Sequence, residues 1–186
     1  MNIIINKIQR YLAVFVLMIV GFQLMQESVQ AEVYSPVIIE PYDEASLEKI
    51  NRSFTSIKTY MGKVMADGTA LKEATKRNAA NPTQENGAEL IEKTGKAINT
   101  NVEFLSKSEA ALGRAIPEIR KYKEYLRKMA KSMKKQNDSA FLSGETKWAQ
   151  DEVKALESFL NEMEEMREDF KKMKQDYAAV SSAWVH

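Results

Sequence analysis

The sequence has no cysteine, and its single histidine is His186, the last of 186 residues. A chain without thiols forms no disulfide and no zinc–thiolate site, and one without an internal imidazole lacks the most common general base and metal ligand. Four prolines and seven scattered glycines supply neither a phosphate-binding loop nor a nucleophile elbow. We therefore expect a protein that is not an enzyme and that binds no metal and no cofactor.

An excess of either charge is also absent. Lys and Arg number 27 against 26 Asp and Glu. Residues 1–31 contain two of the basic residues and one of the acidic ones, so 25 of each sign remain beyond that segment. Nucleic-acid binders carry a basic excess that neutralises phosphates, and we therefore expect no nucleic-acid partner.

Residues 1–31 have the three parts of a cleavable signal peptide: a basic start, an apolar run of twelve residues over 11–22, and small residues at Val29 and Ala31. Cleavage is predicted after Ala31. The alternative is a retained membrane anchor, but twelve helical residues reach only about 18 Å of a hydrocarbon core roughly 30 Å thick. The protein is thus expected in the periplasm or secreted, and membrane contact is expected only through the leader if it stays uncleaved.

The next segment, residues 32–42, contains two prolines and the apolar run Val37-Ile38-Ile39. The prolines predict an extended conformation because they disfavour helix in themselves and in the residues before them. The apolar run predicts that this segment lies in a groove of the folded body. A strand donated to the sheet edge of a partner is the alternative.

From residue 43 onward the chain carries a seven-residue apolar repeat, the pattern of helices that pack as a coiled coil. The spacing links Ile50 to Leu71 in one segment and Ala149 to Trp184 in another. In the middle segment it joins seven residues without a gap: Ile91, Ile98, Leu105, Leu112, Ile119, Leu126 and Met133. We predict helices over 43–79, 82–135 and 144–183, with Asn81 as the N-cap of the second and Pro82 as its first residue.

Three such helices joined by short polar connectors predict an all-α fold, an elongated antiparallel three-helix coiled-coil bundle over 43–186. One feature allows an alternative. Pro117 lies inside the second helix and opposite a slip in the repeat between Met163 and Met166. A sharp kink there would fold the second helix back and produce four helices.

Two blocks of opposite charge face each other in this arrangement. Residues 114–135 hold nine basic and two acidic side chains, whereas residues 151–169 hold eight acidic and two basic ones. A hairpin centred near residue 140 brings the two blocks side by side. We expect them to select helix pairing and direction, rather than to bind an external polyanion.

The middle helix is predicted to be longer than its neighbours, so each end of the bundle should protrude as a two-helix hairpin. The far hairpin would expose aromatic side chains that no third helix covers, and its tip adds an apolar pair in an otherwise polar loop. Aromatic residues are favoured anchors of protein interfaces. The predicted partner-binding residues are Phe141, Leu142, Tyr122, Tyr125 and Trp148. The alternative is that Phe141 and Leu142 fold back over Trp148.

These expectations favour an exported, non-enzymatic helical protein that binds another macromolecule or self-assembles through an exposed hairpin. A protein partner is therefore expected, and a homo-oligomer is one form of it. Two alternatives remain: a periplasmic holdase chaperone or secretion-apparatus subunit, and a small-ligand sensor with a pocket near the polar row Thr94, Asn101 and Ser108. The methionines in the repeat are expected as core filler and not as copper ligands.

Overall fold

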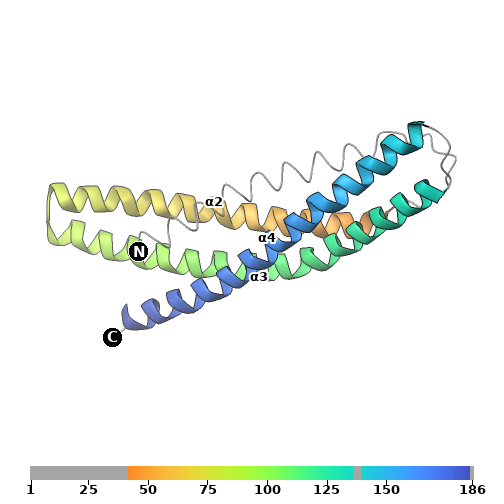
Figure 1. Cartoon of the computed structure of the whole chain (residues 1–186). Helices are drawn as coiled ribbons and strands as arrows, with labels where there is room; N and C mark the ends of the chain where they lie inside the picture. The colour runs from red at the N-terminus through yellow and green to blue at the C-terminus, as the bar shows by residue number, and fades with distance from the viewer. Residues whose placement is uncertain (1–41, 136–139, 185–186) are drawn as a thin grey trace. The chain divides into compact units, whose positions relative to one another are not determined.

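The computed structural model describes residues 42–135 and 140–184 and contains three helices. They are α2 (Glu44–Ala80), α3 (Gln84–Lys135) and α4 (Ala140–Trp184) (Figure 1). The helices pack against one another, and no strand occurs in the described ranges. The prediction of an all-α three-helix bundle is confirmed. The predicted leader, the cleavage site at Ala31 and the extended segment 32–41 lie outside the described residues.

The connection between α2 and α3 shows that the predicted N-cap of α3 is wrong. The amide N–H of Asn86 donates to the hydroxyl oxygen of Thr83 at 3.1 Å, and the N–H of Gly87 donates to the Thr83 carbonyl at 2.9 Å. Thr83 is therefore the N-cap of α3, not Asn81. Asn81 contributes its carbonyl oxygen instead, which accepts from the side-chain amide of Asn86 at 2.6 Å.

The third helix also starts earlier than predicted. It begins at Ala140 and not at residue 144, so Phe141 and Leu142 belong to the first turn of α4 and not to a polar loop. Their side chains lie outside the described part of the structure.

The described helices divide into two compact units. The first contains the start of α2 up to Asn51, α3 from Arg114 and α4 up to Met166; the second contains α2 from Arg52, α3 up to Gly113 and α4 from Arg167. In the first unit the fully buried side chains include Ile50, Ile119, Leu126, Leu156 and Met163.

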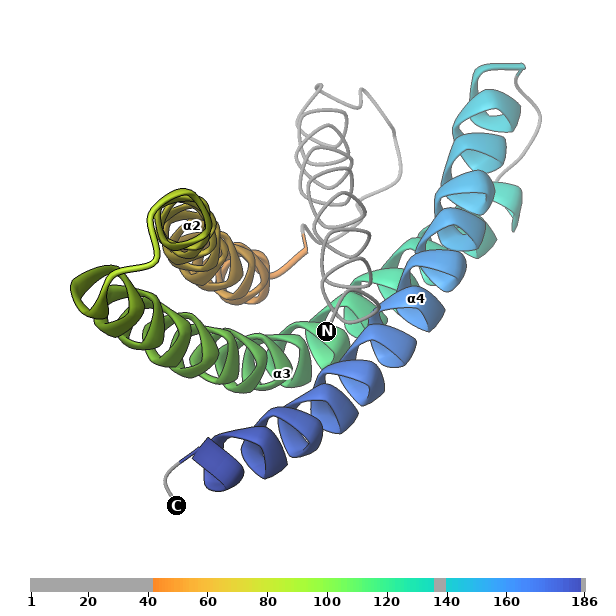
Figure 2. The same ribbon diagram turned by 90° about the vertical axis from the view of Figure 1, so that its left-hand side faces the viewer.

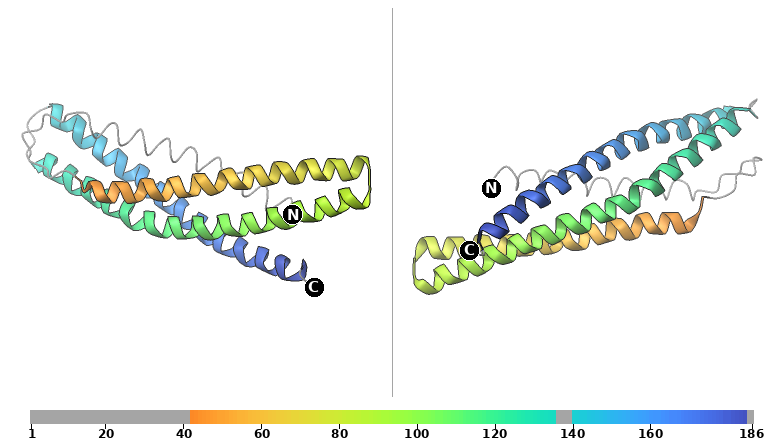
Figure 3. Two further views of the ribbon diagram at one scale, coloured as in Figure 1. Left: turned by 180° about the vertical axis from the view of Figure 1, so that it is seen from behind. Right: turned by 90° about the horizontal axis from the view of Figure 1, so that it is seen from below.

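In the second unit the core contains Ile57, Leu105 and Leu112, each at most 1% exposed. Phe104 and Phe170 join α3 to α4 there with an edge-to-face ring contact at 5.7 Å. Over this unit α2 and α3 run side by side as an antiparallel hairpin, seen from its connecting loop in Figure 2 and from two further sides in Figure 3. The repeat read from the sequence thus forms the buried rows of both units.

Helix α3 continues without interruption through Pro117. The four-helix alternative is therefore wrong for the described chain. The divisions between the two units nevertheless fall next to the two predicted irregularities, after Gly113 in α3 and after Met166 in α4. Pro117 has no N–H to donate to the carbonyl of Gly113. At Gly113 the guanidinium carbon of Arg167 lies 3.5 Å from where a Cβ would be, so a methyl group there would make an ordinary contact with α4.

Within the described ranges, no helix combines the length and the apolar character needed to cross a bilayer.

Candidate functional site

The charge blocks lie against each other as predicted. Glu157 of α4 accepts from Arg127 at 2.6 Å and lies 3.7 Å from Lys123. Arg120 pairs with Glu164. Most of these side chains are substantially exposed, so each pair contributes about 0.2–1 kcal/mol at most. Their combined effect is to set the antiparallel register of α3 and α4, and they confirm the pairing of the two blocks.

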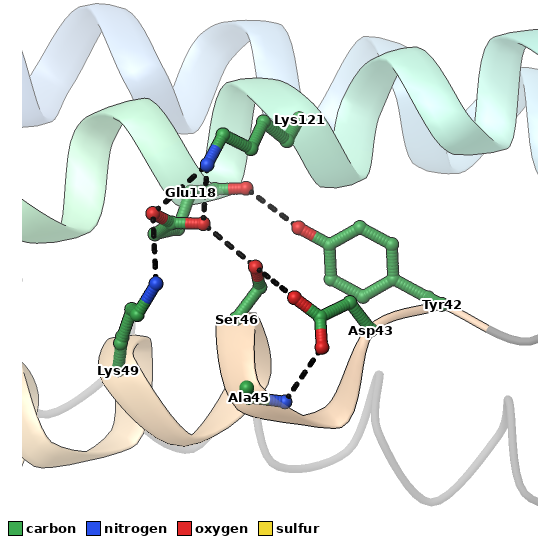
Figure 4. Close-up of polar contacts among 7 residues, drawn as sticks. All are labelled: Tyr42, Asp43, Ala45, Ser46, Lys49, Glu118 and Lys121. Carbon is green, nitrogen blue, oxygen red and sulfur yellow. Dashed lines mark hydrogen bonds and ion pairs between the residues drawn. The ribbon is translucent and has the colours of Figure 1, made fainter.

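A polar cluster around Glu118 attaches the start of α2 to α3 (Figure 4). The Glu118 side chain is largely buried, and its Oε2 atom lies 2.8 Å from Ser46 Oγ. Lys121 Nζ donates to both carboxylate oxygens at 3.1 Å, and Lys49 Nζ lies at 3.8 Å. These donors lower the pKa of Glu118 from its ordinary 4.5, with Ser46 the largest cause and Lys121 the next. The carboxylate is therefore ionised at neutral pH.

Asp43 completes this cluster as the N-cap of α2. Its Oδ1 atom accepts from the Ala45 N–H at 3.0 Å, and its Oδ2 atom lies 2.9 Å from Ser46 Oγ. Since a serine hydroxyl carries a single proton, Ser46 donates to only one of Asp43 and Glu118 at a time. The hydrogen bond from Ser46, the largest cause, lowers the pKa of Asp43.

Tyr42 covers the aromatic residues that were expected to be uncovered. Its hydroxyl donates to the Glu118 carbonyl at 3.0 Å, and its ring lies 5.0 Å from Tyr122 and 5.4 Å from Tyr125. Tyr122 is only 4% exposed, and burial raises its pKa. The expectation that Tyr122 lies open to a partner is wrong, because Tyr42 packs over it. Tyr125 and Trp148 are half-buried.

Two of the three side chains in the polar row proposed for a ligand pocket form hydrogen bonds within their own helix. Thr94 donates to the Leu90 carbonyl at 2.7 Å, and Asn101 donates to the Ala97 carbonyl at 2.8 Å. Ser108 is fully buried rather than at an edge, and its hydroxyl has no hydrogen-bond partner. The Thr94 hydroxyl and the Asn101 amide thus each donate to a backbone carbonyl one turn earlier in α3. Among the residues that the structure describes, no group of three or more His, Asp or Glu could hold a metal ion.

The exposed apolar surface lies on the α2–α3 hairpin of the second unit. Two large apolar side chains are exposed in the described part of the chain, Met65 at 59% and Ile91 at 62%. Ile91 was predicted as part of the buried row. It is seven residues before the half-buried Ile98 and fourteen before the fully buried Leu105, so it lies on the same stripe of α3 as they do.

The register of α4 explains why Ile91 is exposed. Lys174 pairs with Glu109 at 2.7 Å. Helix α4 ends at Trp184, ten residues after Lys174. Because α3 and α4 are antiparallel, this end lies opposite a position about ten residues before Glu109, at about position 99 of α3. Ile91 lies about eight residues, or roughly 12 Å, beyond that point. The repeat of α3 thus continues past the last turn of the described helix that covers it.

Met65 and Ile91 lie at different levels of the hairpin. The Asp67–Lys96 and Arg77–Glu89 ion pairs place Met65 opposite about position 100 of α3 and Ile91 opposite about position 74 of α2. The two levels are about nine residues, or roughly 14 Å, apart along the helices.

Glycines flank both exposed residues. Gly62 and Gly68 lie three residues on either side of Met65, and Gly95 lies four residues after Ile91. A Cβ at any of these three positions would meet no atom within 4 Å. We define the hairpin face as the surface of α3 around Ile91, between the end of α4 and the α2–α3 loop.

Comparison of the chain with family models, with curated proteins and with solved structures found no match in any of the three.

Proposed function

We propose that this chain is an exported, non-enzymatic helical protein that binds another protein molecule through an exposed helical hairpin. The observation that carries the proposal is the hairpin face. Ile91 is exposed there, on a repeat whose other members in α3 are buried or half-buried. Large apolar side chains that a fold leaves uncovered on a patterned helix are typical of a protein-binding surface.

Export is the second part of the proposal. It is supported by the basic start, the apolar run and the small residues at Val29 and Ala31. The test is mass spectrometry of the amino terminus of protein recovered from its cells. A chain that begins at Glu32 supports export with cleavage, and a chain that begins at Met1 contradicts it.

The binding part is tested by capture from the envelope fraction with the processed protein and three variants. Ile91→Asp places a charge on the hairpin face. Ala66→Glu is its matched control, because Ala66 is exposed on the same hairpin and lies one residue, or about 100°, around α2 from Met65. Selective loss of a captured protein with Ile91→Asp supports the proposal. Equal capture by the wild type and Ile91→Asp overturns it.

The third variant, Phe141→Asp with Leu142→Asp, tests the predicted tip of the far hairpin separately. If this double variant loses the partner and Ile91→Asp keeps it, the binding surface is the start of α4 and not the hairpin face. We expect the double variant to bind as the wild type does.

A further inference from the structure

We infer that the outward side of α3 in the first unit binds the anionic headgroups of a phospholipid membrane. Four exposed basic side chains form this surface, which we call the basic face: Arg114, Lys121, Lys128 and Lys131. It is separate from the hairpin face and adds a second binding surface to the chain. From the proposed function the inference takes only the export of the chain.

The structure divides the basic block of α3 into two sides. Three of its side chains pair with glutamates of α4: Arg120, Lys123 and Arg127. Lys121 pairs with Glu118 of its own helix but is 61% exposed. Three others are exposed and form no ion pair in the part of the chain that the structure describes: Arg114, Lys128 and Lys131. The acidic block of α4 therefore neutralises only one side of the basic block.

The basic face is a straight row on the outside of α3. At 100° per residue, its four side chains lie between about 140° and 240° around the helix from Leu126, which is fully buried. They therefore point away from the core of the first unit. From Arg114 to Lys131 the row is about 25 Å long. Glu124 is the acidic side chain within this arc, and it pairs with Arg127.

The remaining acidic side chains of the opposite block face other directions. Glu162 and Glu165 of α4 are exposed. Glu165 lies about 180° around α4 from the buried Leu156. Glu162 lies about 140° from Glu157, which pairs with Arg127 of α3. Positive and negative charge thus stay on separate sides of the unit, and a negatively charged surface can orient it.

A membrane surface fits this row better than a nucleic acid does. Clusters of Lys and Arg along an amphipathic helix are typical of binding to anionic lipids. Three of the four side chains are lysines, whose flexible stems carry point charges that adapt to mobile headgroups. The arc contains no Asn or Gln, which read base edges. Export, as proposed, also places the chain beside a membrane. The inference departs from the expectation that a membrane is contacted only through the leader.

The charges predict weak, salt-sensitive binding. Each basic side chain near an anionic membrane raises the affinity about fivefold, so four raise it several hundredfold. Half-saturation is then expected at roughly millimolar lipid. The arc presents no Leu, Phe or Trp that would insert among the acyl chains. Binding should therefore be lost at high salt, where exposed charges are screened.

The test is cosedimentation of the protein, in the form recovered from its cells, with phospholipid vesicles. One set contains about 30% phosphatidylglycerol in phosphatidylcholine, and the other contains phosphatidylcholine alone. At about 150 mM salt we expect binding to the anionic vesicles only, with release at about 500 mM. Equal binding to both sets of vesicles, or to neither, would overturn the inference.

Matched variants locate the binding surface. Lys128→Gln with Lys131→Gln should weaken binding about twentyfold, whereas Lys128→Arg with Lys131→Arg keeps the charge and should bind as the wild type does. The control is Lys147→Gln with Lys154→Gln. It removes the same charge from two exposed lysines of α4 that lie about 160–180° around that helix from the buried Leu156, and it should change binding by less than about twofold.

Circular dichroism of each variant reports whether the helices are retained. Equal losses in the two glutamine variants would show that net charge, and not the basic face, attracts the vesicles, and would overturn the inference. Duplex DNA of about 30 base pairs is tested at the same salt. Tighter binding to DNA than to the vesicles would overturn the lipid assignment. None of these results touches the hairpin face, which is tested by capture through Ile91.

Discussion

The Glu118 cluster predicts a loss of stability that depends on pH. Glu118→Gln keeps an acceptor for Ser46, 2.8 Å away, but removes the charge. A hydrogen bond to a charged group contributes about 1.5–3 kcal/mol and a neutral one about 0.5–1.5 kcal/mol. Lys49 and Lys121 are each 61% exposed, so their pairs add only a few tenths of a kcal/mol. We expect the free energy of unfolding at pH 7 to fall by about 1.5 kcal/mol.

The pKa of Glu118 sets the pH range of this effect. Its pKa is lowered in the folded protein from an ordinary value of 4.5, so the unfolded chain binds the proton more tightly. The charge therefore stabilises the fold fully above about pH 5, and this contribution is lost as the pH falls through the folded value. The difference between the wild type and Glu118→Gln should shrink well below its pH 7 value at pH 3.

Urea unfolding of both proteins at pH 7 and pH 3 measures this difference. Glu124→Gln is the matched control on the same helix, because Glu124 is 52% exposed and pairs with Arg127 within one turn. We expect the control to lose only a few tenths of a kcal/mol. The reasoning is refuted if Glu118→Gln costs no more than the control at pH 7, or if its cost is the same at both pH values.

Three further substitutions test the packing, each by urea unfolding. Thr83→Ala removes the cap of α3 and should lower the free energy of unfolding by about 1 kcal/mol. Thr59→Ala, at an exposed hydroxyl that donates to the carbonyl of Thr55, is the control and should cause no measurable change. Equal losses in the two variants would contradict the cap assignment. Leu112→Ala should lower the free energy of unfolding by about 2–5 kcal/mol because Leu112 is fully buried. Ile91→Ala should lower it by under about 0.5 kcal/mol in the monomer. A large loss of stability in Ile91→Ala would show that the isolated chain covers this side chain. Gly113→Ala should stabilise the protein by about 0.5–1 kcal/mol, since the new Cβ would make an ordinary 3.5 Å contact with Arg167. A loss of stability would show that the packing of α4 against this position tolerates no methyl group.

The buried rows could be predicted from the sequence because they depend on a local property. Leu105 and Leu112 lie seven residues apart in α3, as do Met163 and Phe170 in α4. A residue on such a row is buried wherever a partner helix lies beside it. The repeat does not say how far the partner extends. Ile91 belongs to the same row, yet it is exposed because α4 ends opposite about position 99.

Contacts between residues that are far apart in the sequence could not be predicted, for a different reason. Tyr42 and Glu118 are 76 positions apart, and neither has a spacing that marks it. Only the observed register of α2 against α3 brings them together, and with it the burial of Tyr122. Both Asn81 and Thr83 are residue types that cap a helix, so the sequence alone does not identify the N-cap of α3. The hydrogen bond from the Asn86 N–H to the Thr83 hydroxyl identifies it.

Photo-cross-linking tests the role of the hairpin face most directly. A photoreactive residue is placed at position 91 in one protein and at position 66 in another, and both are expressed in the cells that export the chain. The central prediction is an adduct of another protein with position 91, and none with position 66. No adduct from position 91, or the same adducts from both positions, would contradict it.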